Sequence, residues 1–182
     1  KLVSPDFGQN LGGELPLFIH QIPVSKKSEL TYQANRLVSR LAKQGKKAII
    51  IDLFDLSVKI LDEEGVLQTL LEEEKELDSD AISSTLDSIL DIKEVVIPRI
   101  NDIIQEEAPD FTFITGVGRV YPFMRSHGIL NNIEELANES NLILFFPGDY
   151  NNLQLSLFGI ISDENYYRGH NLNDIKCSYD NI

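Results

Sequence analysis

Cysteine and long apolar runs are the scarcest features of this 182-residue sequence, which holds one cysteine, one methionine and no tryptophan. The lone Cys177 has no second cysteine for an internal disulfide or a zinc site, which is typical of proteins in a reducing compartment. No run of about 18 apolar residues is present, and we find no signal-peptide pattern. We therefore expect a cytoplasmic protein without a membrane span.

Basic residues are also scarce, and they are distributed unevenly. The chain carries 16 Lys and Arg against 29 Asp and Glu, a formal net charge of −13 at pH 7. Such a charge repels nucleic acid and anionic membranes on average, so we expect neither as a direct partner. Nine acids lie between Asp62 and Asp80, whereas seven Lys and Arg lie between Lys26 and Lys47, with Glu29 as their one acidic neighbour. The acidic block is typical of a solvated helix surface.

Four continuous apolar runs predict the strands of a central sheet. They are Leu15–Ile22, Lys47–Leu53, Phe111–Thr115 and Asn141–Phe146. Short runs rich in β-branched and aromatic residues are typical of parallel strands that are buried on both faces. Beyond them, Leu153, Leu155 and Leu157 alternate with polar residues, which predicts a further strand or a hairpin arm.

Helical patterns separate these runs. Apolar residues recur at helical spacing from Leu30 to Leu41, and we expect this helix to end near Gly45. Asp52 stands at the end of a predicted strand, where its carboxylate is expected to cap the following helix. Several more helices are predicted before the third strand, and Pro98 suits the first turn of one of them.

The alternation of strands and helices favours an α/β fold. We predict a three-layer sandwich in which a mostly parallel central sheet of about five strands carries helices on both faces. The length suits a single domain over residues 1–182. Residues 1–14 contain Pro and several Gly and predict a loop-like start, and residues 173–182 predict a frayed tail.

Polar and aromatic residues gather in a glycine-rich turn after the third predicted strand. They are Gly116, Gly118, Arg119, Tyr121, Arg125, Ser126 and His127. The spacing lacks the third glycine of a dinucleotide fingerprint and the lysine of a phosphate loop. Two interpretations stay open: a tight turn whose arginines cap carbonyls or pair with carboxylates, and a ligand site at the carboxyl end of a strand.

Two further clusters follow later in the chain. Pro147-Gly148-Asp149-Tyr150 comes directly after the fourth strand and predicts a loop on the same rim of a parallel sheet. Asn165, Tyr166, Tyr167 and Arg168 are residue types that stack on and hydrogen-bond to a base or a peptide. We predict that the three clusters meet on one rim and form a binding surface.

A basic stripe runs beside the apolar face of the helix that begins at Leu30. Arg36, Arg40, Lys43 and Lys47 are spaced four, three and four residues apart. This stripe suits an acidic partner or a nucleic-acid backbone, and it equally suits an ordinary solvated helix face.

No nucleophile elbow, metal-binding helix motif or paired Cys/His cluster occurs, so we predict no metal and no cofactor and favour a non-catalytic protein over an enzyme. His20 lies within a predicted strand, where a packed and hydrogen-bonded histidine is the usual case. A tertiary site built from His127, His170 and an acid such as Asp163 or Glu164 stays an alternative.

Taken together, three long segments resemble a known family. TGVGRVYPFMRSHGILNNIEEL, LILFFPGDYNNLQLSLFGII and DENYYRGHNL match, in order, segments of the BrxB proteins of the BREX (bacteriophage exclusion) defence systems. LVSPDF, ELPLFIHQIP and AIIIDLFDL are similar to the earlier blocks of that family, so the resemblance covers nearly the whole chain. The matching positions are Gly116, Gly118, Tyr121, Pro122, Arg125, Ser126, His127, Pro147, Gly148, Tyr150, Asn165, Tyr166, Tyr167 and Arg168. Gly169-His170 departs from the family pattern, so the resemblance implies no role for His170.

The resemblance implies a component of a multi-protein anti-bacteriophage system. Its expected partners are other BREX proteins, namely an ATPase, a methyltransferase and an alkaline-phosphatase-like component. It implies no reaction, because the family has no established activity of its own. Our preferred hypothesis is an adaptor or scaffold. The alternative is a degenerate nucleotide-binding regulatory domain in which Arg119 or Arg125 meets phosphate over the glycine loop at 116–119.

Overall fold

The structure is a computed structural model that describes residues 2–4, 7, 11, 15–73, 78–124, 126–133, 136, 139–151, 154–162, 167 and 169–175. Most of the predicted loop-like start and frayed tail therefore lies outside the described residues. Among the described residues, no helix is long and apolar enough to cross a membrane.

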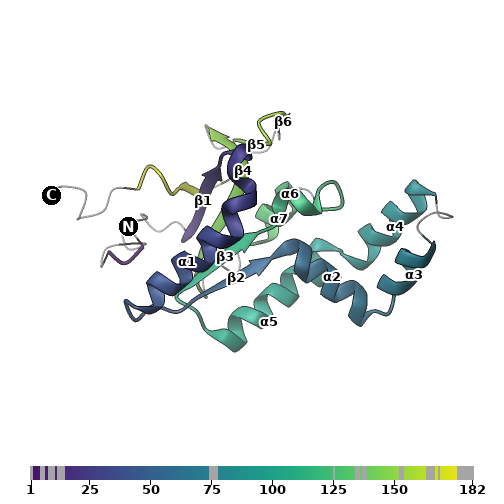
Figure 1. The fold of residues 1–182 in the computed structure, drawn as a ribbon, viewed down its shortest axis with the longest axis horizontal. Coiled ribbons are helices and arrows are strands. Elements are labelled where there is room, and N and C mark those ends of the chain that lie inside the picture. The colour runs from purple at the N-terminus through teal and green to yellow at the C-terminus, as the bar shows by residue number, and fades with distance from the viewer. Residues whose placement is uncertain are drawn as a thin grey trace.

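A mostly parallel sheet forms the centre of the molecule (Figure 1). Its strands are β1 (Leu17–Ile22), β2 (Ala48–Asp52), β3 (Phe111–Thr115), β4 (Asn141–Asn151), β5 (Gln154–Leu157), β6 (Ile161–Ser162) and β7 (His170–Asn171). The order β2-β3-β4-β1-β7 is parallel throughout, and β5 and β6 extend it as an antiparallel hairpin from the end of β4. The prediction of a mostly parallel sheet built on the continuous apolar runs is confirmed.

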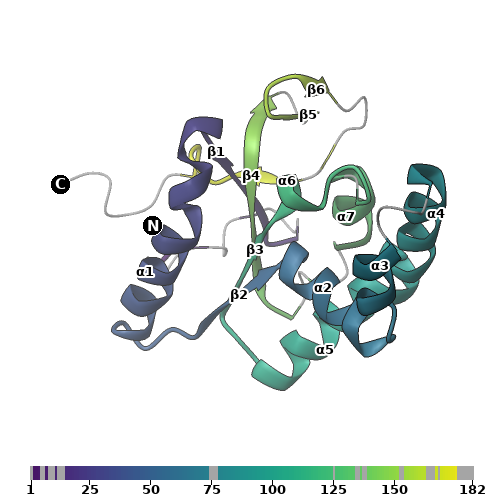
Figure 2. The ribbon, with the colours of Figure 1, turned by 45° about the vertical axis from the view of Figure 1, so that its right-hand side comes forward.

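Helices cover both faces of the sheet, which confirms the three-layer α/β prediction (Figure 2). They are α1 (Leu30–Ala42), α2 (Leu53–Glu63), α3 (Leu67–Glu73), α4 (Ser79–Ile89), α5 (Ile97–Glu107), α6 (Val117–Val120) and α7 (Ser126–Ile133). A 3₁₀ turn, η1 (Val24–Glu29), precedes α1, and a π-helical turn, η2 (Ile92–Val96), precedes α5. Of the described helices, α1 lies on one face, whereas α2, α5, α6 and α7 lie on the other and the α3–α4 pair projects away from the sheet.

Alternating side chains along each strand build two cores. Ile19, Ile114 and Leu144 point to the face covered by several helices, where they join Ile100 and Ile104 of α5. Their neighbours in sequence point the other way, toward α1. That second, smaller core contains Phe18, Phe113, Ile143, Phe145 and Leu41. Because every residue of β3 is buried, the sheet is a rigid support for the residues at its carboxyl rim.

Two sequence predictions about local structure are wrong. Pro147 to Tyr150 do not form a loop, because β4 continues through them and pairs with β5, with Gly148 opposite Leu157 and Tyr150 opposite Leu155. Lys47 does not continue the helical stripe either. Helix α1 ends at Ala42, and Lys47 lies beyond the turn, with its Nζ 2.8 Å from the Glu107 carboxylate.

Candidate functional site

The carboxyl ends of β2 and β3 bring one acid and one arginine together. Asp52 ends β2 and caps α2, and its Oδ1 accepts hydrogen bonds from the backbone N–H groups of Phe54 at 3.0 Å and Asp55 at 3.3 Å. This confirms the predicted cap. Its Oδ2 accepts a hydrogen bond of 2.8 Å from the hydroxyl of Thr115 at the end of β3. The guanidinium of Arg119 on α6 forms an ion pair with the same carboxylate.

These contacts set the charge state of Asp52. Partial burial alone would raise the pKa of its carboxyl, but hydrogen bonds from Arg119, Thr115 and the Asp55 amide hold that pKa below its ordinary value. The hydrogen bond to Asp52 in turn raises the pKa of Arg119. Both groups are therefore fully charged near neutral pH, and the pair links α2 to α6.

The first glycine of the turn makes room for this acid. Gly116 has φ +84°, and a Cβ atom there would lie 2.5 Å from Oδ1 of Asp52. Arg119 also lies 3.3 Å from the Asp55 carboxylate, and its guanidinium carbon lies 4.8 Å from the centroid of the Phe54 ring. The space at the glycine turn is thus occupied by side chains of the protein itself. The pairing of Arg119 with carboxylates agrees with the tight-turn interpretation.

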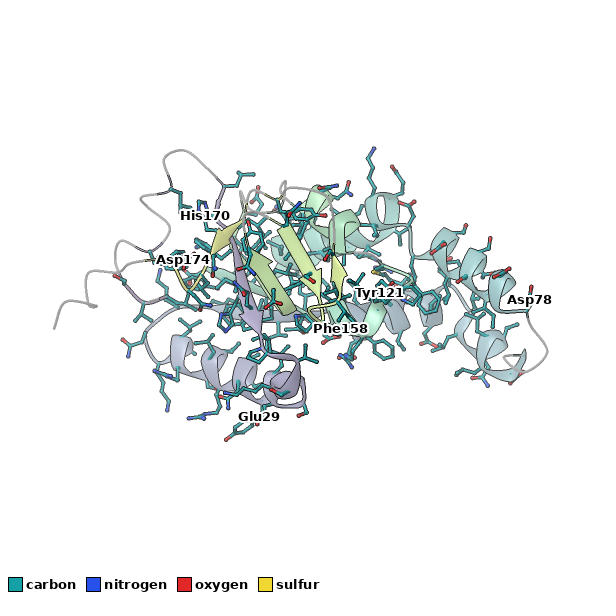
Figure 3. The ribbon with its side chains drawn as sticks, turned by 90° about the horizontal axis from the view of Figure 1, so that it is seen from above. Glu29, Asp78, Tyr121, Phe158, His170 and Asp174 are labelled. Atoms are coloured by element: carbon teal, nitrogen blue, oxygen red, sulfur yellow. The ribbon has the colours of Figure 1, made fainter. Side chains whose placement is uncertain are left out.

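The second glycine packs against two segments that are distant in sequence. A Cβ atom at Gly118 would lie 2.8 Å from the ring of Phe158 and 3.1 Å from Pro147. The glycine turn, the end of β4 and the turn after β5 therefore meet at this point. Tyr121 and Phe158 both lie at the carboxyl ends of the strands (Figure 3).

Tyr150 of the second cluster and Tyr167 of the third are neighbours, but they meet inside the protein. Tyr150 is 4% exposed and Tyr167 is 3% exposed. The Tyr150 hydroxyl lies 2.8 Å from the carbonyl oxygen of Tyr167 and 2.7 Å from that of Gly169. Burial raises the pKa of Tyr150 to about 12, so its hydroxyl stays protonated and donates. The expectation that these two tyrosine side chains face a partner is thus wrong, because both belong to the core.

Removing the Tyr150 hydroxyl should destabilise the fold. We expect Tyr150→Phe to lower the free energy of unfolding by about 1 kcal/mol, because the carbonyls of Tyr167 and Gly169 lose the single hydroxyl donor that they share. Urea denaturation followed by circular dichroism measures the change. Tyr32→Phe is the matched control, since Tyr32 is 64% exposed and should tolerate the same loss. Equal losses of stability in the two variants would contradict a stabilising role for the Tyr150 hydroxyl.

Several predicted residues cannot be placed. Arg125, Asn165, Tyr166 and Arg168 lie outside the described residues. Ser126 and His127 begin α7, and only their backbone is described. Their binding roles therefore stay predictions, as do those of Arg119 and Tyr121.

The structure adds exposed apolar residues that the sequence interpretation missed. Phe123 is 38% exposed, Phe54 is 41% exposed and Ile160 is 80% exposed. These residues follow the carboxyl ends of β2, β3 and β5 in the chain, as do Arg119, Tyr121 and Phe158, and we call the six residues the rim surface. Phe54 was detectable from sequence, because it follows a predicted strand that ends on the same rim. Ile160 was not, since its position depends on the β5–β6 turn.

His20 lies on the other face of the sheet, under α1. Its ring packs edge-on against Phe145 with 5.4 Å between centroids, which fits the packed histidine expected in a strand. Burial lowers the pKa of His20. The expected hydrogen bond is not seen, because Nδ1 has no partner among the residues that the structure describes.

Comparison with known proteins gives a consistent result. A family profile described as BREX protein BrxB matches residues 49–172. A BREX protein BrxB from Bacillus cereus (strain H3081.97) is 33% identical over 183 residues, which cover 96% of this chain and 93% of that protein. Another BREX protein BrxB, from Escherichia coli O9:H4 (strain HS), is 24% identical over 88% of this chain and 80% of its own length. No solved structure gives a significant match.

Proposed function

The chain belongs to the BrxB family of BREX proteins, and on this premise we propose that it is an adaptor that binds other BREX proteins through its rim surface. The observation that carries the proposal is that Phe54, Phe123 and Ile160 are exposed beyond the carboxyl ends of the strands, with the Arg119 guanidinium over the Phe54 ring. Aromatic residues and arginine are enriched where proteins bind one another, and they carry much of the binding energy there.

The rim surface is suited to docking because it rests on fixed elements. Asp52, Thr115 and Gly116 hold Arg119 and the start of α2 in place, and Gly118 lets Phe158 pack directly on α6. A preorganised patch loses less conformational freedom on binding than a mobile one, so more of its contact energy contributes to affinity. The candidate partners are the ATPase, the methyltransferase and the alkaline-phosphatase-like component of a BREX system.

The nucleotide-binding alternative has less support. Arg119 already faces two carboxylates, and the space beside Gly116 is taken by Asp52. A phosphate at the glycine turn would have to approach the Asp52 carboxylate, which repels it. Isothermal titration calorimetry with ATP and GTP tests this alternative directly, and heat of binding at millimolar nucleotide would revive it.

The adaptor proposal predicts loss of binding when the rim surface is made acidic. We expect Phe123→Asp combined with Ile160→Asp to weaken the complex with the BREX partner at least tenfold, because two apolar contacts are replaced by charges that must be desolvated. Co-elution of the purified chain with each candidate partner, followed by calorimetry on the pair that forms, measures the change.

Leu71→Asp provides the matched control. Leu71 is also a large exposed apolar residue, 62% exposed, but it lies on α3, away from the rim surface. This variant should bind as the unmodified protein does. The proposal fails if the chain elutes alone with every candidate partner, or if the double rim variant binds as tightly as the Leu71 control.

A further inference from the structure

A groove runs along α1 on the face of the sheet that this helix covers. It consists of a cavity of about 690 Å³ toward the carboxyl end of α1 and one of about 430 Å³ toward its amino end. The two cavities share His20, Leu37, Arg40 and Phe145 in their walls, so they are parts of one depression. We call it the α1 groove. Helix α1, which lines the groove, lies on the opposite face of the sheet from α2, α5 and α7 (Figure 2).

The walls of the α1 groove are basic in a strongly acidic protein. Lys26, Arg36, Arg40 and Lys43 line it, and none of them forms an ion pair with another described residue. Each of the other Lys and Arg side chains that the structure describes forms an ion pair with a carboxylate. These residues are Lys46, Lys47, Lys59, Lys93, Arg99 and Arg119. Glu29 is the one acid in the described walls of the groove. Among the Lys and Arg side chains that the structure describes, those without a carboxylate partner thus all lie in this groove.

The floor of the groove is apolar. Phe145 of β4 lies at its base, Leu37 of α1 forms one side, and Leu2 and Leu172 complete the apolar lining above the buried Ile143 and Leu41. Arg36 and Arg40 of α1 and its C-cap residue Lys43 are four and three residues apart, so they follow one face of the helix above this floor. A ligand that fits must therefore offer negative charge at regular intervals and apolar groups between the charges.

We propose that the α1 groove binds an acidic, apolar-rich segment of a partner protein in an extended conformation. Helix α1 has 13 residues and is therefore about 20 Å long, which equals about six residues of extended chain. Side chains alternate in direction along such a segment, so carboxylates would reach the cations of α1 while apolar side chains fill the floor. This site is separate from the rim surface and goes beyond the proposed adaptor role there.

Nucleic acid fits the same groove less well. A phosphate backbone would meet the four cations, but it has no apolar side chains for Leu37 and Phe145. It would also approach a protein with a net charge of −13, which opposes a long polyanion more than a short peptide. The two occupants make different predictions, so one experiment separates them.

The test uses fluorescein-labelled probes and fluorescence anisotropy on the full chain. The first probe is a ten-residue peptide that alternates Glu and Leu, the second alternates Glu and Ser, and the third is a single-stranded oligonucleotide of similar charge. We expect the Glu/Leu peptide to bind at least tenfold more tightly than the other two, and its affinity to fall as salt rises.

Variants then locate the site. Arg36→Glu with Arg40→Glu should weaken binding of the Glu/Leu peptide at least tenfold, because two attractive contacts become repulsive. Lys59→Glu with Lys93→Glu changes the net charge equally on α2 and η2, outside the groove, and should change affinity less than twofold. Thermal unfolding of each variant checks that the fold is retained. The rim variant Phe123→Asp with Ile160→Asp should bind the peptide normally, which separates this site from the proposed function.

Three results would overturn the proposal. The first is no binding of the Glu/Leu peptide at millimolar protein. The second is equal affinity for the Glu/Leu and Glu/Ser peptides, since the apolar floor would then contribute nothing. The third is an oligonucleotide that binds more tightly than either peptide and loses affinity in the Arg36/Arg40 variant, which would assign the groove to nucleic acid.

Discussion

Replacing Gly148 by alanine is expected to lower the free energy of unfolding by about 3 kcal/mol. A Cβ atom at this position would lie 2.1 Å from the carbonyl oxygen of Ser156 and 2.9 Å from the amide nitrogen of Phe158. Both atoms belong to the backbone of the opposite strand or its turn, so no side-chain rotation relieves the clash. The β4–β5 pair has to separate locally, which breaks the pairing of Gly148 with Leu157.

The substitution Gly148→Ala should also change local hydrogen bonding in the β4–β5 hairpin. The hydrogen bond of 2.8 Å from the Phe158 amide to the Pro147 carbonyl closes the same hairpin. Amide hydrogen exchange at Phe158 should therefore accelerate in Gly148→Ala, and urea denaturation measures the global change. Gly45→Ala is the control, because Gly45 also has positive φ, +74°, but a Cβ there meets nothing within 4 Å. We expect Gly45→Ala to lower the free energy of unfolding by about 1 kcal/mol. Similar losses in the two variants would show that backbone strain, and not the close approach of β5, decides the effect.

Replacing Asp52 by alanine should lower the free energy of unfolding by about 2 kcal/mol. The change removes the cap of α2, the acceptor for the Thr115 hydroxyl and the half-buried ion pair with Arg119. Asp55→Ala is the matched control. Asp55 is 72% exposed and meets Arg119 at 3.3 Å, so its loss should cost less than about 0.5 kcal/mol. Chemical denaturation of both variants at pH 7 checks the comparison, and an equally small loss in Asp52→Ala would contradict this account.

The effect of Asp52 should also depend on pH. The pKa of its carboxyl is lower in the folded protein than in the unfolded chain, so the unfolded state binds more protons in the interval between the two pKa values. The stabilisation is therefore complete above the ordinary pKa of 3.8 and is lost as the pH falls through the folded value. The stability difference between the unmodified protein and Asp52→Ala should shrink over that acidic range and stay constant between pH 6 and pH 8. A difference that grows on acidification would contradict the assignment.

Local sequence patterns predicted the parts of this protein that depend on neighbours along the chain. The continuous apolar runs are strands of a mostly parallel sheet, Asp52 caps α2, and Pro98 lies in the first turn of α5. Each of these features follows from backbone geometry within a few residues, which the residue types themselves constrain. The distinctive middle and C-terminal segments likewise carried the family assignment.

The predictions that failed concern residues whose environment is set by distant parts of the chain. Pro147 to Tyr150 look like a loop because Pro and Gly are usual turn residues, yet pairing with β5 extends the strand through them. Lys47 continues a helical spacing in sequence, but the chain turns at Gly45 and brings it to Glu107. In both cases tertiary contacts override a local preference.

The sequence by itself determined the four long strands, the helices between them, the mostly parallel sheet and the family, because burial on both faces and capping leave periodic or local traces in the residues. Only the tertiary structure decided which glycines leave room for Asp52 and Phe158, which tyrosines are buried, and which cations lack a carboxylate partner. The physical reason is that a side chain's contacts depend on whichever residues the fold places beside it. For Gly118 and Phe158, or Lys47 and Glu107, those residues are remote in the chain.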